Sequence, residues 1–157
     1  MQTIPVLAND EIQEDRPMPS LNHSHVARNL TVVLDQFKDR FLVLPQLSVN
    51  LNGWSTVPDL ALYKAGTLAP KWMSDEESVS EPPLLVIEIL SPKQNLQPLV
   101  DKVRDYLSHG VKSCWVVIPT TKTISIFPAS GGSRTFVEGI VRDDSLDLEI
   151  PLSQMFA

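Results

Sequence analysis

The stretch that decides the fold runs over residues 84–118 and reads LLVIEILSPKQNLQPLVDKVRDYLSHGVKSCWVVI. It begins with a nearly continuous apolar run over residues 84–90, which is typical of a strand covered on both faces. A helix is predicted to begin near Pro98, whose fixed φ suits the first helical position, and to close at Gly110. Its apolar stripe consists of Leu99, Val103, Tyr106 and Leu107. A second buried-type strand follows over residues 114–118, so the stretch predicts a βαβ unit with two parallel strands and a right-handed crossover.

One more helix and five more strands are predicted around this unit. The helix starts at Asn22 as its N-cap, and its buried face is marked by Val26, Leu30, Val33 and Phe37. The strands are expected over residues 41–49, 57–63, 123–127, 134–140 and 146–150. Residues 1–20 are interpreted as an extended arm and residues 66–83 as a surface loop. The predicted class is α/β (α+β), a single domain over residues 1–157 with a mixed β-sheet flanked by two main helices.

Length and composition favour one ordinary globular domain. The chain has 157 residues, and 43% of them are hydrophobic, a size and a fraction typical of such domains. Cys114 is the only cysteine, so an internal disulfide framework and a cysteine-based zinc site are excluded. We expect no membrane span and no signal peptide, because the chain has neither an apolar run of about 20 residues nor a basic-then-apolar start. A cytoplasmic location is therefore expected.

The charge is negative overall but unevenly spread. Thirteen basic against 19 acidic residues give a net charge of −6, which argues against a nonspecific polyanion binder. Residues 75–81 carry only acidic charges, whereas residues 92–112 carry four basic and two acidic side chains. An anionic substrate is therefore expected to meet residues 92–112.

Two carboxylates stand out as candidates for chemistry. Glu88 interrupts the apolar run, where an ionised carboxylate is costly unless it is paired, hydrogen-bonded or bound to a metal. The plain alternative is a glutamate near a strand end that reaches solvent or a lysine. Asp59 follows Pro58 at the start of a predicted strand, where an aspartate commonly caps a turn. Two carboxylates on separate strands of one sheet can also converge on a divalent cation such as Mg²⁺.

Lys102 is the candidate basic residue. It lies three residues after Leu99 and four before Tyr106, so it borders the apolar stripe of its helix. Its ammonium could reach the edge of the sheet, or the side chain could simply cover apolar surface. Lys93 is nearer to Glu88 in sequence, but its place in a predicted loop leaves its position less fixed.

Other motifs are weaker. His23 and His25 could form a metal pair, but their place at a helix start disfavours it. Ser91 lacks the G-x-S-x-G motif of a hydrolase nucleophile, and the chain has no Gly-rich phosphate loop. Trp115 and Cys114 lie in a buried-type strand and are expected to belong to the core, with the thiol inert.

Several motifs together resemble the Uma2 family. They are VPDLALY at residues 57–63, PPLLVIEILSP at residues 82–92 and DKVRDYLSHGVKSCWVV at residues 101–117. RPMPSLNHSHV at residues 16–26 is similar to the family's approach to its first helix, with His23 at a recurrent histidine position, and LEIPLSQMF at residues 148–156 resembles its end. The resemblance covers about residues 14–157 and implies a restriction-endonuclease-like fold in a family of endonucleases abundant in cyanobacteria.

The resemblance also implies a site. Asp59 and Glu88 match its acidic metal ligands, and Ile89 would offer its backbone carbonyl as a further ligand. In the wider superfamily a lysine stands two residues after the glutamate; here that position is Leu90, and Lys102 matches the family's lysine on the next helix. Tyr106 would line the same pocket.

The implied function is that of a hydrolase: an endonuclease that cleaves phosphodiester bonds with Mg²⁺ or Mn²⁺ held by Asp59 and Glu88. Lys102 would orient the attacking water or neutralise phosphoryl charge. The expected partner is nucleic acid, with DNA preferred, and a homodimer is left open.

One departure keeps an alternative open. Family members often begin with a hairpin that carries a glutamate, and neither Glu11 nor Glu14 aligns with it clearly. The alternative function is a catalytically inactive nuclease fold that acts as a nucleic-acid- or protein-binding module. Metal binding through Asp59 and Glu88 separates the two functions.

Overall fold

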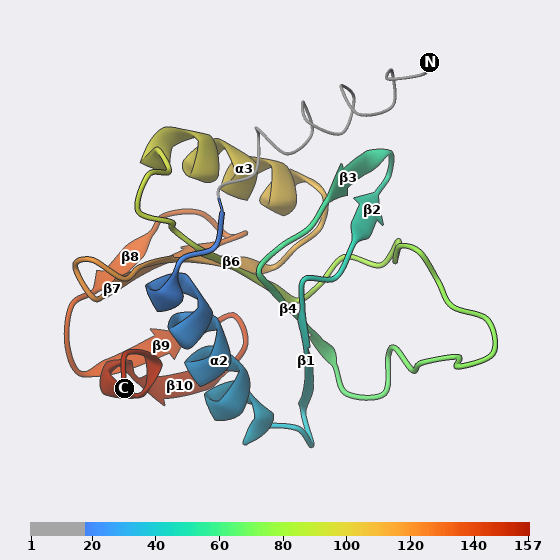
Figure 1. The fold of residues 1–157 in the computed structure, drawn as a ribbon, viewed down its shortest axis with the longest axis horizontal. Helices are drawn as coiled ribbons and strands as arrows, with labels where there is room; N and C mark the ends of the chain where they lie inside the picture. The colour runs from blue at the N-terminus through green and yellow to red at the C-terminus, as the bar shows by residue number, and fades with distance from the viewer. Residues whose placement is uncertain (1–17) are drawn as a thin grey trace, which may run out of the picture.

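The computed structural model describes residues 18–157, which form one six-stranded sheet, two short two-stranded sheets and three helices (Figure 1). The strands are β1 (Phe41–Pro45), β2 (Val49–Leu51), β3 (Trp54–Thr56), β4 (Leu60–Lys64), β5 (Leu85–Ile89), β6 (Ser113–Ile118), β7 (Thr123–Pro128), β8 (Arg134–Phe136), β9 (Ile140–Asp143) and β10 (Leu148–Pro151). The helices are α2 (Leu21–Asp35), α3 (Leu96–Ser108) and α4 (Leu152–Met155). None of the helices in the described part of the chain is long and apolar enough to cross a membrane.

The predicted βαβ unit is confirmed. In the six-stranded sheet, ordered β1-β4-β5-β6-β7-β8, β5 and β6 are parallel neighbours whose register runs from Leu85 opposite Ser113 to Ile89 opposite Val117. Helix α3 connects them, and the other neighbouring pairs of this sheet are antiparallel. The predicted fold class, a mixed sheet with α and β elements, is therefore confirmed.

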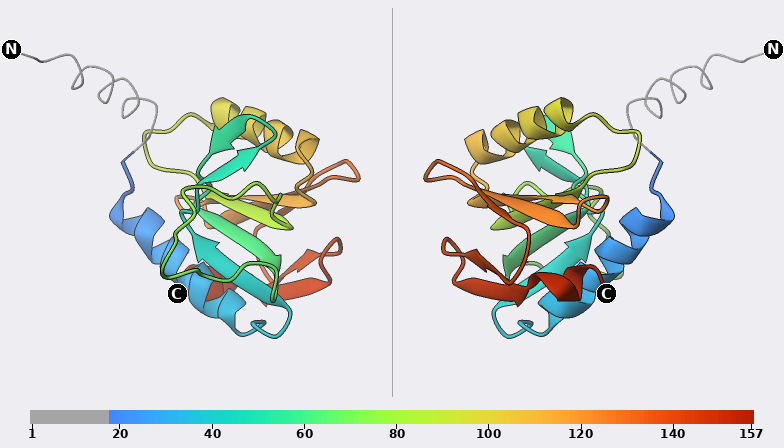
Figure 2. Two further views of the ribbon diagram at one scale, coloured as in Figure 1. Left: turned by 90° about the vertical axis from the view of Figure 1, so that its right-hand side faces the viewer. Right: turned by 90° about the vertical axis from the view of Figure 1, so that its left-hand side faces the viewer.

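The two faces of the sheet are covered by different layers. Figure 2 shows α2 with α4 on one side of the sheet and α3 with the β2–β3 hairpin on the other. Leu85, Ile87 and Ile89 pack into the core on the α2 side, whereas Val86 packs with α3 and the hairpin. Since side chains alternate along a strand, Glu88 shares the face of Val86 and points toward α3.

Several predicted boundaries are wrong by a few residues, each for a local reason. The strand expected over residues 41–49 is broken after Pro45, because Gln46 has a φ of 49° and turns the chain before β2 begins. The strand expected over residues 134–140 divides near Gly139, whose φ is 74°. The strand expected over residues 57–63 begins only at Leu60, after the Pro58–Asp59 turn into the sheet.

The helix starts were also misplaced. Ser20, not Asn22, caps α2, because the Ser20 hydroxyl accepts the backbone N–H of His23 at 3.2 Å. Helix α3 begins at Leu96, so Pro98 is its third residue and not its first. A proline is tolerated there because the backbone N–H groups of a first helical turn have no partner within the helix. The short helix α4 was not predicted.

The structure describes the loop predicted over residues 66–83 but only the end of the arm predicted over residues 1–20. The arm expected over residues 1–20, with Glu11 and Glu14, lies outside the described residues up to residue 17. Residues 66–83 form the predicted surface loop, which Figure 1 shows extending away from the sheet. Val79 of this loop forms a bridge with Val49 of β2, and the Tyr63 hydroxyl of β4 donates to the backbone carbonyl of Glu81 at 2.8 Å.

Candidate active site

Glu88 is the buried carboxylate around which the site is arranged. Its residue is only 5% exposed, and its side chain points from β5 toward α3. The Tyr106 hydroxyl donates a hydrogen bond to Glu88 Oε1 at 2.9 Å, and Lys102 Nζ lies 3.0 Å from the same oxygen. Both donors reach one atom because Lys102 and Tyr106 are four residues apart and therefore share a face of α3.

Asp59 reaches the same end of the sheet from the neighbouring strand. Leu60 in β4 pairs with Ile87 in β5, so continuing this antiparallel register by one residue sets Asp59 opposite Glu88. Residues directly opposite in an antiparallel pair point to the same face of the sheet. Asp59 Oδ2 accepts the backbone N–H of Ile89 at 2.7 Å, which ties the carboxylate to the strand that carries Glu88.

His23 completes the cluster from the other layer. It lies in the first turn of α2, is 6% exposed, and its Nε2 atom is 3.2 Å from Asp59 Oδ2. A carboxylate oxygen can only accept, so Nε2 carries the hydrogen that bridges the two atoms. The sequence prediction had placed this histidine at a recurrent position of the resembling motif and had weighed it as half of a metal pair with His25, which is exposed, but it had not paired it with Asp59.

Burial and neighbouring charge set the protonation states. Burial raises the pKa of Glu88 to about 7, against the opposing effect of Lys102 and with a further rise from the charge of Asp59. The hydrogen bond to Asp59 raises the pKa of His23, while burial lowers it and the charge of Glu88 adds to the rise. Burial also raises the pKa of the Tyr106 hydroxyl, so this hydroxyl stays protonated and remains a donor. The two carboxylates and the histidine are therefore electrostatically coupled.

Each carboxylate has one oxygen engaged and one free of donors. Within residues 18–157, the hydrogen-bond and ion-pair donors contact Oδ2 of Asp59 and Oε1 of Glu88 and leave Oδ1 and Oε2 without one. The side chain of Asp59 is 20% exposed and that of Glu88 only 6%, so the pair lies at the boundary between the interior and the surface. Two carboxylates at neighbouring positions of β4 and β5 are a ligand set that fits Mg²⁺ or Mn²⁺, which accept one or two carboxylates and complete their shell with other oxygens.

The cluster is not a closed metal centre. No group of three His, Cys, Asp or Glu side chains within residues 18–157 is arranged to hold a metal ion. His23 presents an N–H rather than a lone pair to Asp59, so it does not act as a third ligand in this arrangement. A cation here would need backbone, water or substrate oxygens in addition to Asp59 and Glu88.

The β2–β3 hairpin supports Tyr106 from outside. Thr56 Oγ1 lies 3.1 Å from the Tyr106 hydroxyl, and since the phenol hydrogen goes to Glu88, the threonine hydroxyl donates. Trp54 packs its ring against Tyr106 at a centroid distance of 4.9 Å and stacks on His109 at 5.1 Å. The sequence prediction missed this support because it did not separate the hairpin from its neighbouring strands.

The structure thus brings together Asp59, Glu88, Lys102 and Tyr106, and Ile89 joins them through its backbone N–H. Lys93 stays in the exposed connector, as its loop position suggested. Two side chains were missed as site components: Thr56, and His23 as the partner of Asp59. Recurrence of His23 in the resembling motif was the one signal that pointed to it.

Cys114 and Trp115 are fully buried, as predicted. Burial raises the pKa of the Cys114 thiol, which keeps it protonated. Trp115 Nε1 and the Ser113 hydroxyl both donate to Asp143 Oδ2, at 2.7 and 2.6 Å, so this second buried carboxylate is held within the core.

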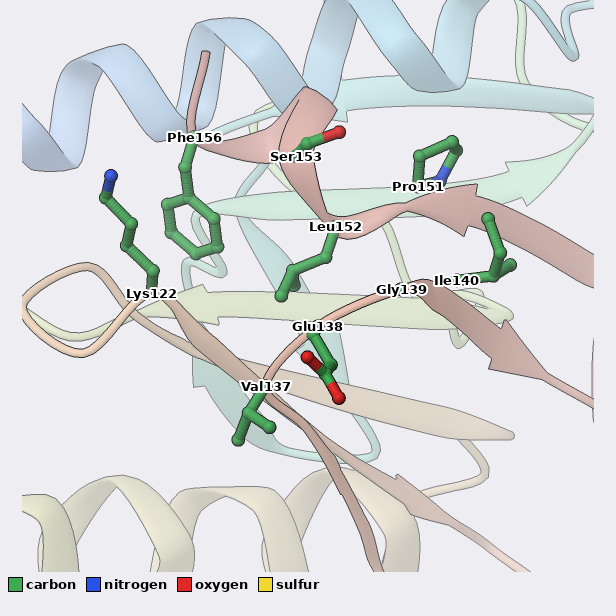
Figure 3. Close-up of a pocket in the computed structure, with 9 residues that line it drawn as sticks. All are labelled: Lys122, Val137, Glu138, Gly139, Ile140, Pro151, Leu152, Ser153 and Phe156. Carbon is green, nitrogen blue, oxygen red and sulfur yellow. The ribbon is translucent and has the colours of Figure 1, made fainter.

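The surface hollows lie elsewhere. A hollow of about 620 Å³ lies near the C-terminus and is lined mainly by apolar residues together with Lys122 and Glu138. Figure 3 shows the side chains that line it. Its lining residues come from residues 122–156, and none belongs to the carboxylate cluster. The cluster is the better candidate for chemistry, because it combines buried charge, converging donors and free acceptor oxygens.

Comparisons with known proteins agree with this reading of the fold. The sequence model of the Uma2 family, described as "Putative restriction endonuclease", matches residues 5–156. A crystal structure from Anabaena variabilis ATCC 29413, described as a "putative nuclease belonging to DUF820", is similar with a TM-score of 0.78 and 21% identity. The match covers 90% of this chain and 83% of that chain. No curated protein matches the sequence.

Proposed function

Because the chain belongs to the Uma2 family, we propose that it is a divalent-metal-dependent endonuclease that hydrolyses phosphodiester bonds of nucleic acid. One observation carries the proposal: Asp59, directly before β4, and Glu88 in β5 lie beside the ammonium of Lys102, and each has one oxygen that no donor within residues 18–157 contacts. Two carboxylates held close together repel each other, and a bound cation would relieve that repulsion.

Asp59 and Glu88 would hold Mg²⁺ or Mn²⁺ through Oδ1 and Oε2, with the backbone carbonyl of Ile89 as a further ligand. The engaged oxygens of both carboxylates are already fixed by N–H and O–H donors, so the free ones are oriented before any cation binds. The chemistry supplied by a cation at such a site is polarisation of the scissile phosphate and activation of a water molecule.

Lys102 would act on the phosphate or on the attacking water. Its side chain is 32% exposed, against 6% for Glu88, so its ammonium reaches both the buried carboxylate and the surface. One of its three hydrogens points to Glu88 Oε1, and the others are available for a phosphoryl oxygen or a water. Water adds to phosphorus, the P–O bond to the leaving nucleotide oxygen breaks, and a proton passes to that oxygen.

Nucleic acid, with DNA as the favoured substrate, would approach along α3 and the connector before it. Lys93 in the connector and Arg104 on α3 are exposed, and the side chain of Lys102 is 32% exposed. Positive charge close to a buried site focuses a polyanion on it even when the whole molecule is acidic. The proposal therefore reconciles the net charge of −6 with an anionic substrate.

The test is cleavage of supercoiled DNA, linear DNA and RNA with Mg²⁺, with Mn²⁺ and with EDTA. We expect cleavage only with a cation, and a loss of at least about 100-fold in Asp59→Asn, Glu88→Gln and Lys102→Met, since each removes a charge acting at the reacting phosphate. Exposed residues of the same types far from the site give matched controls, Asp35→Asn, Glu149→Gln and Lys38→Met, which should cleave normally. Binding of nucleic acid without cation-dependent cleavage would instead establish the inactive binding module.

A further inference from the structure

His23 is a buried titratable side chain at the site to which the proposed reaction gives no role. We propose that His23 is a positioning residue, which acts through Asp59 by fixing the carboxylate with its free oxygen turned toward Glu88. The inference rests on the proposed function, because it assumes that Asp59 is a metal ligand.

Two donors converge on one oxygen of Asp59. His23 Nε2 lies 3.2 Å from Oδ2, and the backbone N–H of Ile89 lies 2.7 Å from the same atom. The N–H of Ile89 alone would let the carboxylate turn about that single contact. A second donor, from a different element, removes this freedom and leaves Oδ1 as the oxygen that can accept a cation.

His23 is itself held in place from three sides. Ser20 caps α2 by accepting the backbone N–H of His23, so the first helical turn is fixed. The next turns of α2 carry Val26 and Leu30 into the core, at 4% and 0% exposure. The side chain of His23 is only 8% exposed, so neighbouring residues enclose the imidazole. A side chain fixed in this way is suited to orient a neighbouring carboxylate. Residues that hydrogen-bond to metal ligands play this part at metal sites.

Glu88, like Asp59, has two donors at one of its oxygens. Tyr106 and Lys102 both contact Glu88 Oε1 and leave Oε2, just as His23 and Ile89 contact Asp59 Oδ2 and leave Oδ1. The donors come from opposite layers, with His23 on α2 and Tyr106 on α3. If the donors serve to orient the free oxygens, the same pattern is expected on both carboxylates.

The test is the affinity of the full chain for Mn²⁺, measured from the electron paramagnetic resonance signal of the free ion at pH 8. His23→Leu fills the space without a donor, and His23→Asn has an amide too short to reach Asp59. His23→Gln carries an N–H close to the place of Nε2. His25→Leu is the matched control, because His25 lies two residues further along the same helix and is exposed.

We expect Mn²⁺ affinity to fall about 10- to 100-fold in His23→Leu and His23→Asn, the usual effect of losing a residue that orients a ligand. His23→Gln should recover most of it, and His25→Leu should bind as the wild type does. Melting curves recorded without metal show which variants are folded. If His23→Leu does not fold, His23→Asn takes its place in the test.

The outcomes separate the inference from the proposed function. Wild-type affinity in folded His23→Leu or His23→Asn overturns the inference alone, and so does an equal loss in His23→Gln, because a donor at that place would then be irrelevant. A wild-type protein that binds no Mn²⁺, and whose Asp59→Asn and Glu88→Gln variants behave like it, overturns the proposed function and the inference with it.

Discussion

At the scale of residues, the site depends on the cost of keeping a carboxylate inside the protein. Glu88 is buried, and an ion transferred out of water is expensive unless charge and hydrogen bonds compensate. Lys102 and Tyr106 compensate at one oxygen only. The remaining cost is the reason that burial raises the pKa of Glu88 to about 7.

The raised pKa of Glu88 predicts how the stability of the metal-free protein depends on pH. The folded pKa of about 7 exceeds the ordinary value of 4.5, so the folded state holds the proton more tightly than the unfolded state. The resulting stabilisation is fully present below pH 4.5 and is lost as pH rises through 7. The loss is on the order of 3–4 kcal/mol, since the folded and ordinary pKa values differ by about 2.5 and one pKa unit corresponds to about 1.4 kcal/mol.

Glu88→Gln should remove this dependence, because glutamine does not titrate. Urea unfolding in EDTA at pH 5, 6, 7 and 8 should therefore show wild-type stability declining more steeply with pH than that of Glu88→Gln. His23, whose pKa is raised mainly by the hydrogen bond to Asp59, contributes in the same direction in both proteins. The smaller rise of its pKa that comes from the charge of Glu88 is lost in Glu88→Gln and adds to the difference between the two slopes. Parallel pH profiles for the two proteins would contradict the assignment of the raised pKa to Glu88.

At the scale of elements, the turn after α3 is the most constrained connection of the βαβ unit. Gly110 has a φ of 97°, and a Cβ added there would lie 3.2 Å from Cγ of Pro82 in the loop before β5. The backbone conformation favours glycine, and the close approach to Pro82 adds a steric requirement. The turn thus fixes how α3, with Lys102 and Tyr106, leads into β6.

Gly110→Ala should lower the free energy of unfolding by about 1–2 kcal/mol, because it combines left-handed strain with contact against Pro82. Gly131→Ala is the matched control, since Gly131 has a similar φ of 103° but nothing within 4 Å of an added Cβ. The control should lose less, about 1 kcal/mol. Equal losses in urea titrations of both variants would show that Pro82 imposes no constraint.

How much the sequence predicted also differs by element. The βαβ unit was predicted because its order depends on local patterns, an apolar run, a 3.6-residue stripe and a second apolar run. The break after Pro45 was missed because Gln46 adopts a left-handed φ that its residue type does not indicate. The contact between His23 and Asp59 joins residues 36 positions apart in α2 and before β4, and no local pattern reports it.

At the scale of the whole molecule, the site lies where both layers of the fold meet the ends of β4 and β5. Helix α2 lies on one side of the sheet and α3 on the other (Figure 2), and each contributes a donor to one of the carboxylates. The sheet supplies the spacing of Asp59 and Glu88, and the two helices supply their orientation. Fold and site are therefore coupled, and a cation bound there would stabilise the folded chain as a whole.

The measurement that tests this account most directly is the anomalous difference map of a crystal soaked in Mn²⁺. The account predicts a single strong peak between Asp59 Oδ1 and Glu88 Oε2, at about 2.0–2.6 Å from each oxygen, in the range of hard-cation ligation. The peak should vanish in a soaked Glu88→Gln crystal that is otherwise unchanged. A map with no peak between the two carboxylates, or with its strongest peak away from them, would contradict the claim that Asp59 and Glu88 form a divalent-metal site.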